Sequence, residues 1–169
     1  TSDDTYHATP TAFLESLVFW GPRTLADHAV QVTPADIQIL ASRHVGIAHN
    51  PESNMKLASG IAPVEAMRKA GLAVGLGTDG AASNNGLDLF ETMKFAALVQ
   101  KNHRWDATAL PAQKALDMAT RDAADALHRP DLGRIVPGAT ADLCMVDFRR
   151  GHLVPRHDDV SNPVDSANG

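Results

Sequence analysis

Short apolar runs alternate along the chain with longer segments that repeat apolar residues at helical spacing. The runs at 24–30, 45–48 and 72–76 predict three buried strands. Helical spacing, often after a Thr-Pro or Ala-Pro start, predicts helices at 9–19, 33–41, 62–70, 87–100, 111–119 and 121–127. This alternation of strand and helix predicts parallel βαβ units.

The pattern changes after residue 131. The segment 133–138 is rich in turn residues, and 141–147 alternates like a strand, with Cys144 expected inside it as a small buried hydrophobe. We therefore expect two parts, a set of strand–helix units at 1–131 and a small accessory β element within 132–169.

Composition excludes several classes of protein. A formal net charge of −5 gives no nucleic-acid footprint, and no apolar run approaches the roughly 20 residues that cross a bilayer. The single cysteine excludes an internal disulfide and fits a reducing cytoplasm.

The chain begins with Thr1 and holds three strand–helix units, whereas a (β/α)8 barrel needs about 250 residues. We therefore expect it to be part of a larger protein.

The third apolar run leads directly to a carboxylate, Asp79, followed by Gly80 and other small residues. In an α/β barrel, residues at the carboxyl ends of the strands form the active site. Asp79 is thus a candidate metal ligand or proton acceptor. The alternatives are an Asx turn at Asp79 and an anion-binding nest over 80–86, although the segment lacks the spacing of known phosphate loops.

Two histidines accompany the first two predicted strands. His28 lies 51 positions before Asp79, which places the two on strands two apart, and alternate barrel strands contribute to one layer. His28 and Asp79 can therefore share one site, the alternative for His28 being a hydrogen-bonded core residue. His49 ends the middle strand and is expected to shape the pocket, and Asn50, Ser53 and Asn54 offer neutral hydrogen bonds to a heterocycle or ribose. The segment 52–59 is expected to be a functional loop.

The segments 24–28, 49–63 and 77–85 closely resemble the metal-dependent amidohydrolase superfamily, and within it the 5-methylthioadenosine/S-adenosylhomocysteine deaminases and related chlorohydrolases. Residues 133–143 resemble the point where that family's chain returns to its small β-sandwich. The resemblance implies an α/β fold that is the C-terminal part of a (β/α)8 TIM-type barrel, with part of an accessory β-sandwich.

The resemblance also implies a chemistry. A divalent metal, zinc with iron as the alternative, activates a water that attacks an aromatic carbon bonded to nitrogen. Asp79 is then the metal ligand and proton shuttle of the last strand, and His28 the histidine that holds the water. His49, Asn50 and Asn54 face the substrate. The implied activity is hydrolytic deamination of an adenosine-type nucleoside by a cytoplasmic enzyme that forms a homo-oligomer at full length, without a nucleic-acid or membrane partner.

Two departures from the family pattern matter. Asp27 and Ala29 flank His28 where the family has Ala-His-Cys, and the family segments that carry the first-strand His-x-His and the fifth-strand His-x-x-Glu are not found in these 169 residues. A catalytic zinc site uses three protein ligands and a water. We therefore expect the 169-residue chain to be inactive by itself, and poorly stable because its sheet edges are open. A non-catalytic binding or assembly module on the same scaffold is the main alternative, and a phosphate-binding protein using 80–86 a weaker one.

Overall fold

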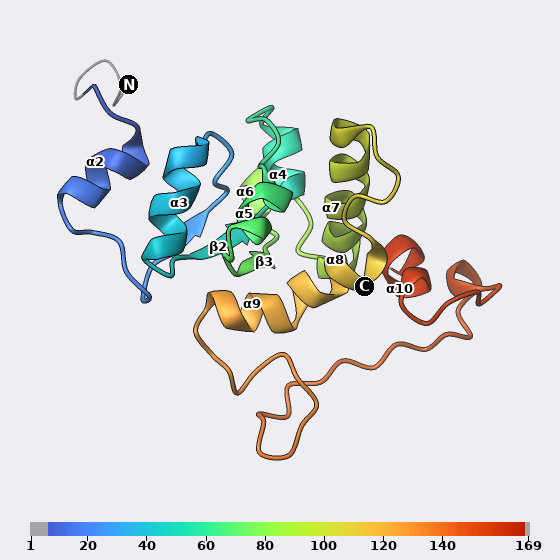
Figure 1. Cartoon of the computed structure of the whole chain (residues 1–169). Helices are drawn as coiled ribbons and strands as arrows, with labels where there is room; N and C mark the ends of the chain where they lie inside the picture. Colours follow the sequence, from blue (N-terminus) through green and yellow to red (C-terminus); the bar gives the residue numbers. More distant parts are fainter. Residues whose placement is uncertain (1–6, 168–169) are drawn as a thin grey trace.

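A computed structural model describes residues 7–167 and contains a parallel sheet of three short strands (Figure 1). Strands β1 (Leu25–Asp27), β2 (Gly46–His49) and β3 (Val74–Leu76) lie in the order β1-β2-β3. Each strand pairs in parallel with its neighbour in the chain. The structure confirms the predicted strand order and direction, although β1 and β3 are shorter than the apolar runs that predicted them.

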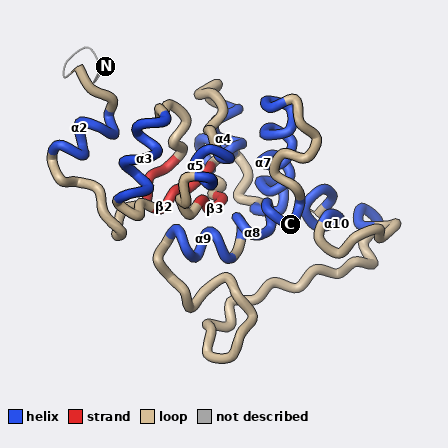
Figure 2. The backbone as a smooth tube through the Cα atoms, viewed as in Figure 1, coloured by secondary structure: helices blue, strands red, loops and turns tan. Residues whose placement is uncertain are grey.

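Helices connect and cover the strands (Figures 1 and 2). They are α2 (Pro10–Ser16), α3 (Pro34–Ser42), α4 (Pro51–Lys56), α5 (Val64–Lys69), α6 (Ala81–Asn84), α7 (Leu89–Arg104), α8 (Ala112–Ala119), α9 (Arg121–Ala126) and α10 (Ser161–Ser166), with a 3-10 turn at Gly151–Leu153. Within residues 7–167, none of these helices is long and apolar enough to span a membrane. The prediction of a loop over 52–59 is wrong, because its first half is helix α4.

Helix starts follow the predicted capping chemistry. The Thr33 hydroxyl accepts a hydrogen bond from the Asp36 amide at 3.2 Å, and the Asp36 carboxylate accepts one from the Thr33 amide at 2.8 Å. This reciprocal pair, with Pro34 in the first turn, fixes the start of α3. The Thr9 hydroxyl accepts a hydrogen bond from Ala12 in the same way at the start of α2.

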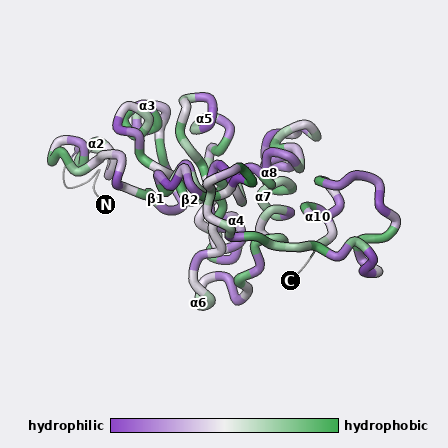
Figure 3. Tube along the Cα trace, turned by 90° about the horizontal axis from the view of Figure 1, so that it is seen from below, coloured by the Kyte–Doolittle hydropathy of each residue, from purple (hydrophilic) through white to green (hydrophobic). Residues whose placement is uncertain are grey.

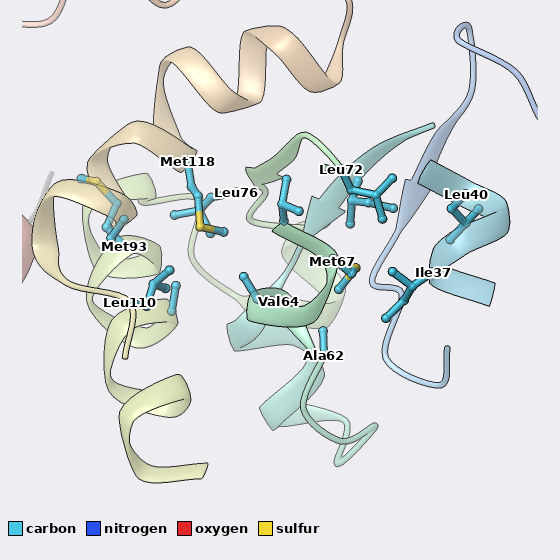
Figure 4. Close-up of a cluster of buried hydrophobic side chains, with 14 of the residues drawn as sticks. Ile37, Leu40, Ala62, Val64, Met67, Leu72, Leu76, Met93, Leu110 and Met118 are labelled. Atoms are coloured by element: carbon cyan, nitrogen blue, oxygen red, sulfur yellow. The ribbon is translucent and has the colours of Figure 1, made fainter. Parts of the chain in front are cut away.

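The core lies between the sheet and helices α3, α5, α7 and α8 (Figure 4). Ile47 and Val74 of the strands are fully buried, and Leu40 and Met67 come from α3 and α5. Figure 3 shows α3 and α5 on one side of the strands and α6 on the other. One face of the sheet is therefore apolar and covered, as a parallel sheet flanked by helices requires.

Helix α9 packs directly against the backbone of β2 and β3. A Cβ atom placed on Gly46 would lie 2.0 Å from the carbonyl oxygen of Ala126, and one on Gly75 would lie 2.6 Å from the Cα of Ala123. Backbone atoms cannot yield as a flexible side chain can, so these two strand positions require glycine.

The outer strand β1 is not the buried strand that the apolar run at 24–30 predicts. Its residue Leu25 is 41% exposed, and among the described residues β1 pairs only with β2. An apolar strand is buried only where other elements cover it. The apolar pattern of the sequence does not show whether the strand lies at the edge or in the middle of the sheet.

The segment after residue 131 differs from the expected accessory β element. Residues 141–147 form no strand, and the prediction of a buried Cys144 is wrong because its side chain is exposed. Met145 is 96% exposed beside it. Helix α10 then packs against α7 and α8, with Val164 fully buried. The boundary at residue 132 stays a prediction.

Helix α7 confirms the helical pattern at 87–100, and part of the predicted apolar face is buried. Met93 and Ala97, which the spacing places on that face, are buried together with Ala96. Lys94 and Leu98, which the spacing places on the same face, are exposed, Leu98 at 47%. The periodicity identifies the helix, and the packing of α8 and α10 on it selects the buried face.

Gly46→Ala is expected to destabilise the protein by about 1–3 kcal/mol, because the added methyl group overlaps the Ala126 carbonyl. Urea unfolding followed by circular dichroism measures the difference. Gly21→Ala is the matched control, since no atom lies within 4 Å of a Cβ placed there. Equal stability of the two variants would show that α9 does not pack closely against β2 at Gly46.

Candidate metal and catalytic site

His28 and Asp79 occupy the turns that leave β1 and β3 at the carboxyl edge of the sheet. Both have left-handed backbones, with φ of 65° at His28 and 59° at Asp79. This conformation is uncommon outside glycine, although Asp and His adopt it more often than most residues. The strained turns redirect the chain so that both side chains lie over the end of β2.

The two side chains approach closely, as their placement on strands two apart predicts. Nε2 of His28 lies 3.7 Å from Oδ2 of Asp79, and the side chains remain 39% and 30% exposed. The structure therefore brings together the two residues to which the sequence assigns chemistry. Their roles in catalysis stay a prediction.

Both carboxylate oxygens of Asp79 accept hydrogen bonds. Ser53 Oγ donates to Oδ2 at 2.6 Å, and the Gly80 amide donates to Oδ1 at 2.7 Å. These two hydrogen bonds, together with one from Ser83 and the nearby His28, lower the pKa of Asp79 from 3.8 to about 2. Asp79 is thus a fixed anion at neutral pH, aimed at His28.

The other ring nitrogen of His28 contacts helix α4. His28 Nδ1 lies 2.8 Å from Oδ1 of Asn54. Asn54 follows Ser53 in α4, so consecutive residues of one helix hold Asp79 and His28. The sequence singles out Ser53 as a hydrogen-bonding residue, but it does not predict the hydrogen bond to Asp79 or the helix itself. The available signal was Pro51, which favours a helix start at its first position.

The three residues predicted to face the substrate are all buried. His49 is 1% exposed, Asn50 4% and Asn54 3%. Asn50 fits against the chain because residue 77 is glycine, where a Cβ would lie 2.3 Å from Asn50 Oδ1. Contact of these residues with a substrate stays a prediction, and Asn54 is already engaged with His28.

His49 lies buried beneath the site with neither ring nitrogen hydrogen-bonded to any of the described residues. Burial, and secondarily the nearby His28, lowers its pKa from 6.5 to about 4. The imidazole is therefore neutral at physiological pH. This favours the role of shaping the pocket over that of carrying a proton.

The small-residue segment after Asp79 is poorly arranged for an anion. Its first amide, that of Gly80, already donates to Asp79, and the helix that follows is only Ala81–Asn84. A phosphate there would meet the Asp79 carboxylate. The geometry does not favour the phosphate-binding alternative.

The donors present suit zinc but form only part of a zinc site. Imidazole nitrogen and carboxylate oxygen are common zinc ligands, and Nε2 of His28 and Oδ2 of Asp79 point to one region. Within residues 7–167, no group of three or more His, Cys, Asp or Glu side chains is placed to hold a metal ion.

A cavity of about 480 Å³ lies elsewhere, between α5, the end of α7 and the start of α8. Its lining includes Arg68, Lys69, Arg104 and Lys114, but neither His28 nor Asp79. His28 and Asp79 lie at the carboxyl edge of the sheet and not in this cavity. The candidate site is therefore defined by the hydrogen bonds that hold these two side chains, and not by the size of a cavity.

Ser53→Ala is expected to raise the pKa of Asp79 from about 2 toward 3.8, because the variant removes the largest stabilisation of the carboxylate. A lowered pKa stabilises the fold above about pH 4, and this contribution is lost as pH falls toward 2. Carbon-13 NMR of the Asp79 carboxyl group measures the shift. Ser42→Ala, whose hydroxyl donates only to the Ile39 carbonyl, is the control. An unchanged pKa would contradict the geometry.

His49 makes stability depend on pH. Because its pKa is about 4 in the folded chain and about 6.5 unfolded, the unfolded chain binds the extra proton between these values. Stability should therefore fall by about 2 kcal/mol from pH 7 to pH 5 through this residue. The free energies of unfolding of the wild type and His49→Gln at both pH values measure this loss of stability, which should be absent in the variant. The same pH dependence in both would show that His49 takes up a proton freely.

Comparison with known proteins agrees with the resemblance found in the sequence. A 5-methylthioadenosine/S-adenosylhomocysteine deaminase of Pelotomaculum thermopropionicum is 52% identical over 162 residues, which cover 96% of this chain and 37% of that protein. A zinc-bound adenosine deaminase of Xanthomonas campestris superposes with a TM-score of 0.94 at 40% identity, covering 99% of this chain and 38% of the other.

A zinc complex of atrazine chlorohydrolase from Arthrobacter aurescens superposes with a TM-score of 0.92 at 33% identity, covering 98% of this chain and 37% of the other. The chain thus spans less than two fifths of the length of the proteins it matches. The amidohydrolase family pattern matches residues 1–168. The chain therefore belongs to the amidohydrolase family.

Proposed function

We propose that this chain forms the last part of a hydrolytic deaminase that acts on adenosine-type nucleosides of the 5-methylthioadenosine/S-adenosylhomocysteine class. The observation that carries the proposal is the convergence of His28 and Asp79 at the carboxyl edge of the sheet, 3.7 Å apart. The 52% identity to a deaminase of that class supports the choice of substrate.

The proposal includes the architecture of the complete enzyme. The three parallel strands and their helices correspond to the last three units of a (β/α)8 barrel, at 1–131, and the exposed extended segment in 132–169 contributes to a β-sandwich. Ile135 and Met145 are 89% and 96% exposed, which suits residues that another part of the protein covers.

The residues of this chain supply an ordered pair of proton acceptors. Zinc bound at this site would lower the pKa of a water molecule toward neutrality. The low pKa of Asp79 keeps its carboxylate ionised, which favours holding a cation. The same low pKa means that Asp79 passes on any proton it accepts instead of retaining it. His28, held through Nδ1, directs Nε2 toward the same region and can accept a hydrogen bond from the attacking water.

The buried residues behind the pair complete the proposed pocket. His49 and Asn50 end β2, between the strands that lead to His28 and Asp79. A neutral imidazole and an amide at this position add no charge to the pocket, which suits an uncharged heterocycle. We propose that they shape the substrate side without exchanging protons.

A non-catalytic binding or assembly module is the second candidate. The observation that favours it is the lack of a three-ligand metal group within residues 7–167. The deaminase and the non-catalytic module make different predictions when the rest of a deaminase is supplied. We therefore consider a chimera in which this chain replaces the matching segment of the Pelotomaculum deaminase. The chimera should be active if the chain is part of a deaminase and inactive if it is a binding module.

This chimera is expected to release ammonia from 5-methylthioadenosine when loaded with zinc, whereas the isolated 169-residue chain with zinc is expected to show no turnover. Asp79→Asn in the chimera should lower kcat by about 10²–10⁴-fold, because it removes the proton acceptor. Asp159→Asn, an exposed acid paired with Arg156, is the control and should keep full activity. A folded, zinc-loaded chimera without deaminase activity would refute the proposal.

A further inference from the structure

We propose that Asn54 is a positioning residue that fixes the tautomer of His28. Its amide oxygen holds the imidazole proton on Nδ1, so that the lone pair of Nε2 faces Asp79. The importance of this arrangement for catalysis rests on the proposed function, but the tautomer itself does not.

The hydrogen bond has good geometry in a protected place. Asn54 Oδ1 lies 2.8 Å from His28 Nδ1, and Asn54 is 3% exposed. A carbonyl oxygen can only accept, so the proton of the neutral imidazole must lie on Nδ1. In the neutral ring the other nitrogen is then an acceptor. This assigns the lone pair to Nε2, the atom that lies 3.7 Å from Asp79.

The alternative orientation of the amide predicts the opposite. With Asn54 turned over, its NH₂ group would donate to Nδ1, and the proton would move to Nε2 and point at the Asp79 carboxylate. In the structure, Oδ1 contacts Nδ1 of His28, and the Asn54 NH₂ group is buried without a partner among the described residues. The two orientations of the Asn54 amide therefore differ in which ring nitrogen of His28 carries the proton.

The observed orientation creates two acceptors that face each other. Asp79 Oδ2 already accepts from Ser53, and Oδ1 from the Gly80 amide. Nε2 of His28 and the remaining lone pairs of Oδ2 then have no proton between them. Such a pair attracts a shared donor, and a water molecule is the donor that the proposed hydrolysis needs. With a proton on Nε2, the two groups would bond to each other instead.

Helix α4 makes the positioning specific. Ser53 and Asn54 are neighbours on this helix, and one contacts Asp79 while the other contacts His28. The helix starts directly after β2, the strand between the two site residues. Ser53→Ala therefore changes the same turn of helix without touching His28, and it serves as the matched control for Asn54.

The test is the tautomer of His28, read by long-range ¹H–¹⁵N NMR of histidine-labelled protein. The spectra are recorded at about pH 9, where free imidazole is neutral. The wild type should show the Nδ1–H form at His28. Asn54→Ala should lose this form in favour of Nε2–H, Asn54→Asp should keep it because the carboxylate still accepts from Nδ1, and Ser53→Ala should keep it as well.

An Nε2–H signal in the folded wild type, or the same Nδ1–H signal in Asn54→Ala, would overturn the proposal. If Asn54→Ala fails to fold, the wild type and Asn54→Asp still decide the question. Neither zinc nor substrate is used, so the result is separate from that of the proposed function. In an active chimera, Asn54→Ala should also lower kcat about 10- to 100-fold with little change in KM. An inactive chimera would refute the deaminase and leave the tautomer standing.

Discussion

The parallel register of the three strands is the constraint on which the site depends. Leu25 lies opposite Gly46, and Ile47 opposite Val74, so the carboxyl ends of β1, β2 and β3 meet at one edge. The chain leaves β1 and β3 through left-handed turns at His28 and Asp79. A slip of one residue in either pairing would turn the strand over and carry one of these side chains to the other face.

The register is supported from both sides of the sheet. Helices α3 and α5 bury the apolar face, and α9 approaches the other face so closely that Gly46 and Gly75 have no room for a Cβ. The two kinds of contact act together. Apolar burial determines which face of each strand turns toward α3 and α5, and the close packing of α9 fixes its distance from β2 and β3. The sheet with its packed helices thus supports the site, and the hydrogen bonds of Ser53 and Asn54 hold the site side chains themselves.

Sequence reasoning predicted the strands, their order and the pairing of His28 with Asp79, because each rests on periodicity and spacing. It placed β1 in the interior and Cys144 in a buried strand, and both are exposed. Burial depends on which segments cover a strand, and those contacts join residues far apart in the chain. Helix α4 was missed for the related reason that its polar residues are buried by contacts with the site, and not by an apolar stripe.

The polar side chains of α4 explain how a short helix comes to order this site. Asn54 and Ser53 are buried although they are polar, and burying a polar group is costly unless a hydrogen bond compensates. Their partners are His28 and Asp79, the two residues in strained turns. The hydrogen bonds Ser53–Asp79 and His28–Asn54 offset both the strain at the turns and the burial cost on α4, and they form only when all four side chains are in place. The arrangement is therefore cooperative, and the site residues are held as a set before any metal or substrate binds.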